Sequence, residues 1–196
     1  MASYYPEPTT IWESIQYSSL GTSIAESLWA FPTLETIHVI ALVTVFGTIL
    51  IMDLRLLGLA SKSYPVTAMS RDTLKWTWAG FIVAAITGTL LYVSKASSYM
   101  INPFFMGKMM LLAIAGLNMA YFHAVTWKTV NNWDTSPQIP TSAKVAGITS
   151  LLFWMTIVFF GRAIGFTLGI YDCAMVDPTQ DSWFVQMLAG IACNGG

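Results

Sequence analysis

Four apolar stretches constrain the fold of this chain more than any other feature of its sequence. They cover about Leu34–Leu57, Trp76–Ser94, Phe104–Trp127 and Val145–Ile170. Each is close to or above the ~20 residues that an α-helix needs to cross the hydrocarbon core of a bilayer. The sequence therefore predicts an all-α integral membrane protein, with a four-transmembrane-helix bundle over residues 34–170.

The composition supports a membrane environment and excludes nucleic acids as partners. Hydrophobic residues make up 55% of the 196 residues and charged residues only 10%, whereas a soluble domain carries roughly 25% charged residues. The net charge of −1 provides no basic field for a nucleic acid. The expected partners are the lipid bilayer and either a larger membrane complex or further copies of the chain.

The distribution of lysine and arginine predicts the orientation. The first and third loops, with the helix ends beside them, hold six of these residues: Arg55, Lys62, Arg71, Lys75, Lys128 and Lys144. The other side holds Lys95, joined by Lys108 if that side chain snorkels outward. By the positive-inside rule, both loops are cytoplasmic. We therefore expect a multi-pass protein of the bacterial inner membrane with periplasmic N- and C-termini.

The segments outside the bundle are predicted to be extracytoplasmic. Residues 1–33 contain no lysine or arginine, unlike the start of a secretory signal peptide. Within this arm, Ile11–Ala30 is predicted to form an amphipathic helix on the outer interface, and a disordered arm is the alternative. The tail at 171–196 holds Cys173 and Cys193, which we expect to form a disulfide on this oxidising side rather than two free thiols.

Four ionisable residues inside or at the ends of the spans mark a candidate site: Glu35, His38, Lys108 and Arg162. A charge at membrane depth costs at least ~2.5 kcal/mol and usually serves a purpose. At a rise of 1.5 Å per residue, all four fall within an outer layer roughly 12 Å deep. We expect one pocket, in which paired cations suit a haem propionate, a quinone oxygen or a carboxylated substrate. His38 is then the single axial ligand of a haem b iron or a proton-transfer group, and a structural ion network is the alternative.

A second polar cluster is predicted nearer the inner side, formed by Asp53, Arg55, Asn118 and His123. His123 lies some 22 Å deeper than Lys108 by the same helical rise, so His38 and His123 cannot both ligate one haem. We expect His123 and Asn118 to form a polar contact between helices.

Glycines in the fourth span predict close packing of helices. Gly161, Gly165 and Gly169 follow one another at four-residue intervals. Such a stripe lets two helix backbones approach closely within lipid. We expect it to seat a neighbouring helix, either of the same bundle or of another subunit.

Two sequence runs carry a resemblance to an uncharacterised family of four-helix bacterial membrane proteins. They are Trp29-Ala-Phe-Pro32…Glu35-Thr-Ile-His38…Asp53-Leu-Arg55-Leu-Leu-Gly58 and Asn102-Pro103-Phe104-Phe105…Lys108…Asn118…Phe122-His123. The chain also resembles, more distantly, the copper-resistance-D and HemJ-type protoporphyrinogen oxidase groups. HemJ-type proteins bind haem b, and the resemblance assigns His38, Arg55, Lys108 and His123 to their motif positions. The intervals from His38 to Arg55 and from Lys108 to His123 are both longer here.

The leading interpretation is a small inner-membrane protein whose outer-leaflet polar pocket binds haem b or another redox or anionic ligand. It would serve on its own or as an accessory subunit of a membrane complex. Two alternatives stay open at this point: a structural or assembly subunit without cofactor, and a HemJ-like membrane oxidase. Whether the chain is an enzyme is left undecided by its sequence.

Overall fold

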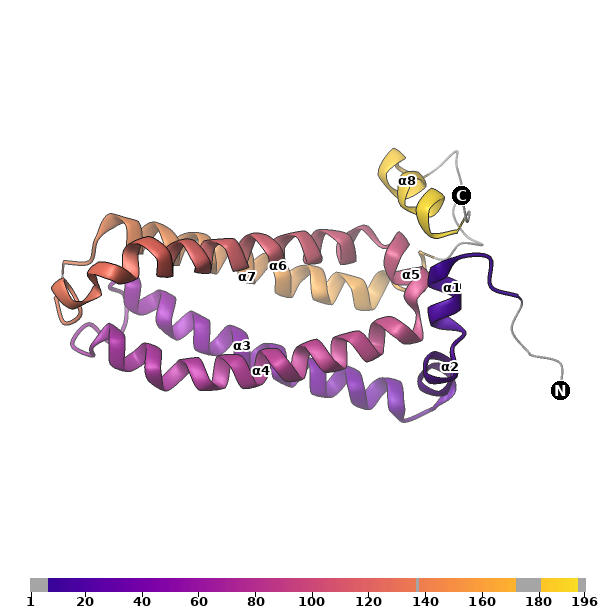
Figure 1. Cartoon of the computed structure of the whole chain (residues 1–196), viewed down its shortest axis with the longest axis horizontal. Helices are drawn as coiled ribbons and strands as arrows, with labels where there is room; N and C mark the ends of the chain where they lie inside the picture. The colour runs from indigo at the N-terminus through magenta and orange to yellow at the C-terminus, as the bar shows by residue number, and fades with distance from the viewer. Residues whose placement is uncertain (1–6, 137, 172–180, 194–196) are drawn as a thin grey trace. The chain divides into compact units, whose positions relative to one another are not determined.

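A computed structural model describes residues 7–136, 138–171 and 181–193, and over these residues the chain is helical without strands. Four helices are long and apolar enough to span a membrane (Figure 1). They are α3 (Ala30–Leu56), α4 (Val66–Ser94), α6 (Pro103–Tyr121) and α7 (Thr141–Thr167). The π-helical turn η1 (Phe122–Thr126) and the 3-10 helix η2 (Trp127–Asn132) continue α6. The predicted all-α fold with four membrane-spanning helices is confirmed.

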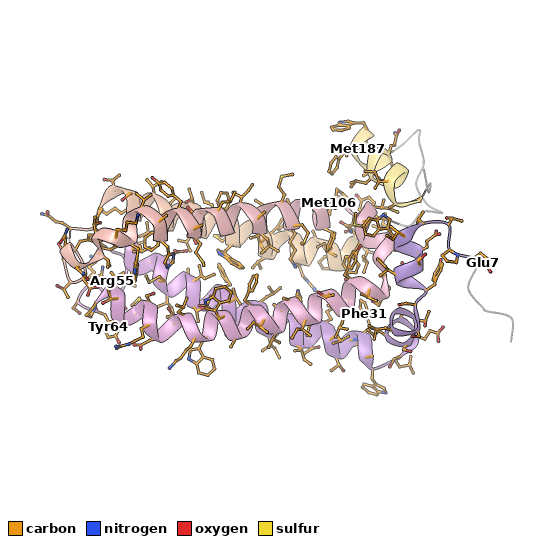
Figure 2. The ribbon with its side chains drawn as sticks, viewed as in Figure 1. Glu7, Phe31, Arg55, Tyr64, Met106 and Met187 are labelled. Carbon is orange, nitrogen blue, oxygen red and sulfur yellow. The ribbon has the colours of Figure 1, made fainter. Side chains whose placement is uncertain are left out.

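The surfaces of the long helices suit a lipid environment. Large apolar side chains are exposed along them, including Val43 at 65%, Leu117 at 70% and Phe159 at 64%. Figure 2 shows such side chains projecting outward from the ribbon. Water would penalise this much exposed apolar surface, whereas the acyl chains of a bilayer do not.

The chain divides into two compact units. The first contains Met1–His38, Ala85–Lys108 and Phe160–Gly196, and the second contains Val39–Ala84 and Met109–Phe159. All four long helices therefore contribute residues to both units.

The first unit adds four short helices to its sections of the long ones. These are α1 (Ile11–Gln16), α2 (Ser19–Glu26), α5 (Ala96–Ile101) and α8 (Trp183–Ala192). The fully buried Ile101 packs with Val185, Ala189 and Ala192 of α8 and with Trp12 of α1. A second cluster joins Tyr99, Ile164 and Leu168 to Phe31, Tyr92, Phe104 and Phe105.

The N-terminal arm forms two helices instead of the single amphipathic helix predicted over Ile11–Ala30. Ser18 interrupts the helix, because its hydroxyl caps α2 by accepting a hydrogen bond from the Gly21 amide at 3.2 Å. Thr10 and Glu13 form a reciprocal capping box at the start of α1. The exact helix boundaries were therefore wrong, while the helical character of the arm was right.

The second unit contains two apolar clusters. One joins Leu56 and Val66 to Phe122, Val130, Trp133, Ile139, Ala143 and Ala146. The other is built on Val45, Ala115, Trp154 and Ile157. Between α3 and α4, the Thr77 hydroxyl donates to that of Thr48 at 2.8 Å. The α4 helix begins at Val66 instead of the predicted Trp76, because the polar residues before the apolar run also adopt helical structure.

Candidate functional site

Lys108 is a partly buried cation of the first unit, on the second turn of α6. In the described part of the chain, the one pair of Lys or Arg with Asp or Glu within 4.0 Å is Arg71–Asp72. The Lys108 ammonium therefore has no carboxylate within that distance among the described residues. A cation that is partly removed from water and has no charged partner raises the free energy of the folded protein unless a hydrogen-bond acceptor reaches it.

Two glycines of α7 make room for charged side chains. A Cβ at Gly161 would lie 3.5 Å from the Lys108 Nζ atom, and one at Gly165 would lie 3.9 Å from the Glu35 Oε1 atom. A Cβ at Gly169 would meet no atom within 4 Å in the described part of the chain, its two chain neighbours aside. The predicted glycine stripe thus accommodates side chains from α6 and α3 within the first unit.

Tyr99 of α5 joins this group, although the sequence analysis did not single it out. Its ring is buried, and the centroid of the Phe105 ring lies 5.1 Å away. Burial, together with the negative charge of Glu35, raises the pKa of Tyr99 to about 12. The phenol therefore stays protonated at neutral pH and remains able to donate a hydrogen bond. Its place directly before the third span was the signal that could have revealed it.

His38 of α3 is held against α4. Its Nδ1 atom lies 3.0 Å from the hydroxyl of buried Thr87. A Cβ at Gly88 would approach the His38 Cε1 atom to 2.9 Å. The imidazole ring therefore occupies the space that the side chain of any other residue at position 88 would need. The imidazole is fixed in orientation by one hydrogen bond and one close backbone approach.

Arg162 does not join the predicted pocket. Its side chain is exposed, and its guanidinium carbon lies 4.5 Å from the centre of the Phe166 ring, itself 68% exposed. Helical geometry explains the correction, since residues four apart share a face whereas neighbours lie about 100° apart. Arg162 and Phe166 therefore share one face of α7, while Gly161 and Gly165 share another.

The first unit does not bring together the two cations that were predicted to bind the propionates of haem b. The cations expected to bind the two propionates do not converge, because Lys108 lies against Gly161 and Arg162 is stacked on Phe166. The predicted pair of propionate-binding cations is therefore not formed.

The predicted inner cluster separates into independent contacts within the second unit. Asn118 joins α6 to α7, donating to the Ala146 carbonyl at 3.1 Å and accepting from the Thr149 hydroxyl at 3.1 Å. His123 instead pairs with the Met119 carbonyl of its own helix at 3.0 Å and stacks on Trp127. Of the two residues expected to form a polar contact between helices, Asn118 therefore does so, whereas the exposed His123, in the π-helical turn η1, does not.

Arg55 and Asp53 are both buried but bind different partners. The Arg55 Nε atom donates to the Tyr64 carbonyl at 2.8 Å (both residues are labelled in Figure 2). Its Nη2 atom donates to the Asp134 carbonyl at 3.1 Å. Asp53 lies close to Ser150, and its buried Oδ2 atom has no hydrogen-bond partner among the described residues.

Asp134 fixes the same loops and was missed by the sequence analysis. Its carboxylate accepts from the Thr67 amide at 2.8 Å and from the Thr67 hydroxyl at 2.7 Å. These bonds cap the start of α4 from a residue 67 positions away in sequence. An acidic residue between two predicted spans was the available signal, but its helix partner was set by tertiary structure.

Comparison with known proteins places the chain in a family. Residues 18–167 match the model of a family of unknown function, DUF6644. The chain belongs to the DUF6644 family. The DUF6644 match covers every residue of the candidate site in the first unit and the whole of the second unit. No curated protein and no solved structure matches this DUF6644 member, and no similarity to copper-resistance-D or HemJ-type proteins is shown.

The disulfide prediction concerns residues beyond the DUF6644 match. Cys193, at the end of α8, is disulfide-bonded. Its predicted partner, Cys173, lies outside the described residues. The described part of this DUF6644 protein contains no free cysteine.

Proposed function

We propose that this DUF6644 protein binds a membrane-soluble ligand through an oxygen atom of the ligand that accepts a hydrogen bond from Lys108. The supporting observation is the partly buried Lys108 ammonium, which has no carboxylate within 4.0 Å among the described residues. An ammonium has three donors and no acceptor. A quinone oxygen or the carboxylate of a long-chain acid would satisfy it, and both reach a protein from the bilayer.

Glu35 and Tyr99 supply the polar surroundings of this site. The Glu35 carboxylate lies beside Gly165, one helical turn from the Gly161 position that faces Lys108. Tyr99, protonated at neutral pH, supplies a further donor whose pKa responds to the Glu35 charge. A neutral quinone suits this mixture of one cation, one carboxylate and one phenol, whereas a carboxylate ligand would meet repulsion from Glu35.

Ligand binding can be tested with two probes on the detergent-purified full chain. A short-chain ubiquinone analogue and oleate are titrated separately while the thermal midpoint is followed, since a ligand that binds only the folded state raises it. We expect one probe to stabilise the wild type and to lose this effect in Lys108→Met. Lys95→Met is the matched control, because Lys95 is a cation of the same unit that lies over the Phe31 ring.

The outcomes separate the two ligand classes. Stabilisation by the quinone alone supports the neutral acceptor, and stabilisation by oleate alone supports an anionic one. If neither probe acts, or if Lys108→Met responds like the wild type, the proposal is overturned. An absorbance spectrum of the same preparation provides a separate check, because a Soret band that disappears in His38→Ala would restore the haem interpretation.

We further propose that the chain is a bacterial inner-membrane protein with periplasmic termini. The asymmetry of lysine and arginine between the loops supports this orientation. The disulfide at Cys193 also supports it, since such bonds persist on the oxidising side of a membrane. A membrane-impermeant maleimide should label Cys193 in intact spheroplasts only after a reductant is added. Labelling that requires membrane disruption would reverse the orientation.

A further inference from the structure

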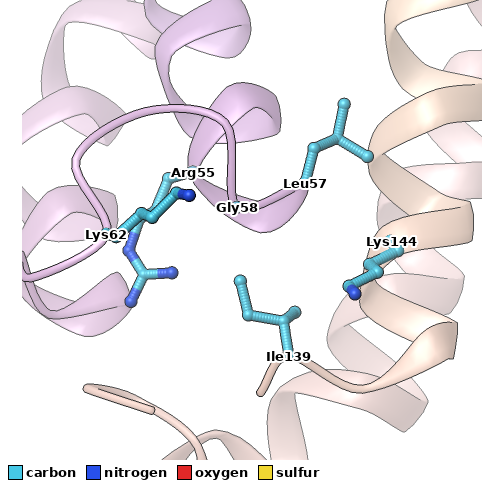
Figure 3. Close-up of a pocket in the computed structure, with 6 residues that line it drawn as sticks. All are labelled: Arg55, Leu57, Gly58, Lys62, Ile139 and Lys144. Atoms are coloured by element: carbon cyan, nitrogen blue, oxygen red, sulfur yellow. The ribbon is translucent and has the colours of Figure 1, made fainter. Parts of the chain in front are cut away.

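A small cavity lined by three cations lies in the second unit, apart from the Lys108 site. Its volume is about 200 Å³. Figure 3 shows its lining residues, which come from the end of α3, the loop that follows it, and the start of α7 with the segment before it. They are Arg55, Leu57, Gly58, Lys62, Ile139 and Lys144. No carboxylate is among the described residues of this lining.

Two backbone features bring these segments together. Gly58 has a φ of +71°, and the Leu59 and Gly58 amides donate to the Leu54 and Arg55 carbonyls, both at 3.0 Å. This glycine-capped end turns the chain sharply after α3 and directs Lys62 back toward the cavity. On the other side, a Cβ at Gly147 would lie 3.4 Å from the Asp53 carbonyl oxygen, so α7 approaches the end of α3 closely.

The positive charge at this cavity is poorly compensated within the described part of the chain. Neither Lys62 nor Lys144 has a carboxylate within 4.0 Å there. Lys144 occupies the first turn of α7, which has no acidic residue. A cation at that end of a helix is disfavoured by the helix dipole, whereas an anion is favoured.

Arg55 adds a fixed donor. Its side chain is 1% exposed, and hydrogen bonds to the Tyr64 and Asp134 carbonyls hold it in place. These bonds use two of the five N–H groups of the guanidinium. Asp134 balances part of its charge, because the Asp134 carboxylate is close enough to interact with Arg55 electrostatically.

We infer that this cavity binds a phosphate group, supplied by an anionic glycerophospholipid at the membrane surface. The cavity is smaller than the ~300 Å³ of a typical small-molecule site, but it suits a single tetrahedral anion. It lies at the end of the candidate span α3 and at the start of the candidate span α7. The ends of membrane-spanning helices lie at the level of the lipid headgroups. Basic pockets beside the ends of membrane helices bind phospholipid headgroups by the same chemistry.

The test compares two double variants in defined membranes. The full chain, Lys62→Gln/Lys144→Gln and the control Lys75→Gln/Lys128→Gln are placed in nanodiscs of phosphatidylcholine with or without phosphatidylglycerol. Lipid retention is measured by native mass spectrometry after release. All four lysines are exposed residues of the same unit, so the control removes the same charge away from the cavity. Arg55 is left intact because it also ties the two loops together.

We expect the wild type and the control to retain phosphatidylglycerol over phosphatidylcholine, and the cavity variant to retain it about fivefold less per lysine removed. Equal loss in both double variants, or no loss in either, would overturn the inference.

Inorganic phosphate is added in a separate arm. If it displaces the lipid from the wild type but has no effect on the residual binding of the cavity variant, the shared phosphate chemistry is supported. Thermal stabilisation by phosphate without lipid retention would identify a free-phosphate site and overturn the lipid assignment.

Discussion

Lys108 and Gly161 face each other within the first unit, with the ammonium in the space that a side chain at position 161 would enter. A Cβ there would lie 3.5 Å from Nζ, which is an ordinary contact distance. Gly161→Ala should therefore leave both folding and probe binding close to wild type. Gly161→Leu should push Lys108 aside at a cost of roughly 1–3 kcal/mol, measured by denaturant unfolding, and should abolish probe binding. Unchanged probe binding in Gly161→Leu would contradict the assigned place of Lys108.

The contact between His38 and Gly88 predicts a mutual dependence of these residues. A methyl group at position 88 would approach the His38 Cε1 atom to 2.9 Å, so the ring must move away from Thr87. We expect Gly88→Ala to cost about 1 kcal/mol through the lost hydrogen bond. In a His38→Ala background the same substitution should cost clearly less, which a double-mutant cycle of unfolding free energies would detect. Additive effects would argue against the contact.

Gly21 should tolerate substitution least, because the atoms around it belong to the backbone. A Cβ at this position would approach the Val93 carbonyl oxygen to 2.9 Å and the Gln16 carbonyl oxygen even more closely. Neither can rotate away, so Gly21→Ala is expected to cost at least about 1–3 kcal/mol. Limited proteolysis should then cleave the α1–α2 arm faster. Gly190→Ala is the control, since a Cβ there would meet no described atom within 4 Å outside its chain neighbours and its own helix backbone.

The Asp134 cap predicts a stability loss in acid. Burial acts to raise the pKa of Asp134, but hydrogen bonds from Thr67 and Val66 and the charge of Arg55 lower it overall. A depressed pKa means that the folded state favours the carboxylate, so this stabilisation is complete above the unfolded pKa of about 4 and is lost as the pH falls further. Asp134→Ala should cost about 1 kcal/mol at neutral pH as a lost helix cap. Its unfolding free energy should also depend less on pH below about 4 than that of the wild type. Asp72→Ala, at an exposed position, serves as the control.

The amino-acid sequence alone was enough to predict that this protein lies in a lipid bilayer, that it has four membrane-spanning segments and that these segments are α-helices. Runs of apolar residues such as Leu34–Leu57 leave few options, because a backbone in lipid must satisfy its own hydrogen bonds and a helix does so locally. The ends of the helices were less certain. The α4 helix begins at Val66, ten residues before the apolar run at Trp76, and therefore includes polar sequence. The Asp134 carboxylate caps this early start of the helix.

Tertiary structure alone decided which charged residues meet. Depth along a helix follows from residue number, so the sequence could predict a common level for Glu35, His38, Lys108 and Arg162, but it could not predict the direction in which each side chain points. Direction depends on how each helix is rotated about its axis, and neighbouring residues point about 100° apart. Because of this rotation, Arg162 lies over the Phe166 ring, and the Lys108 ammonium lies beside Gly161. Rotation is set by the packing of all the helices together, which no local pattern encodes.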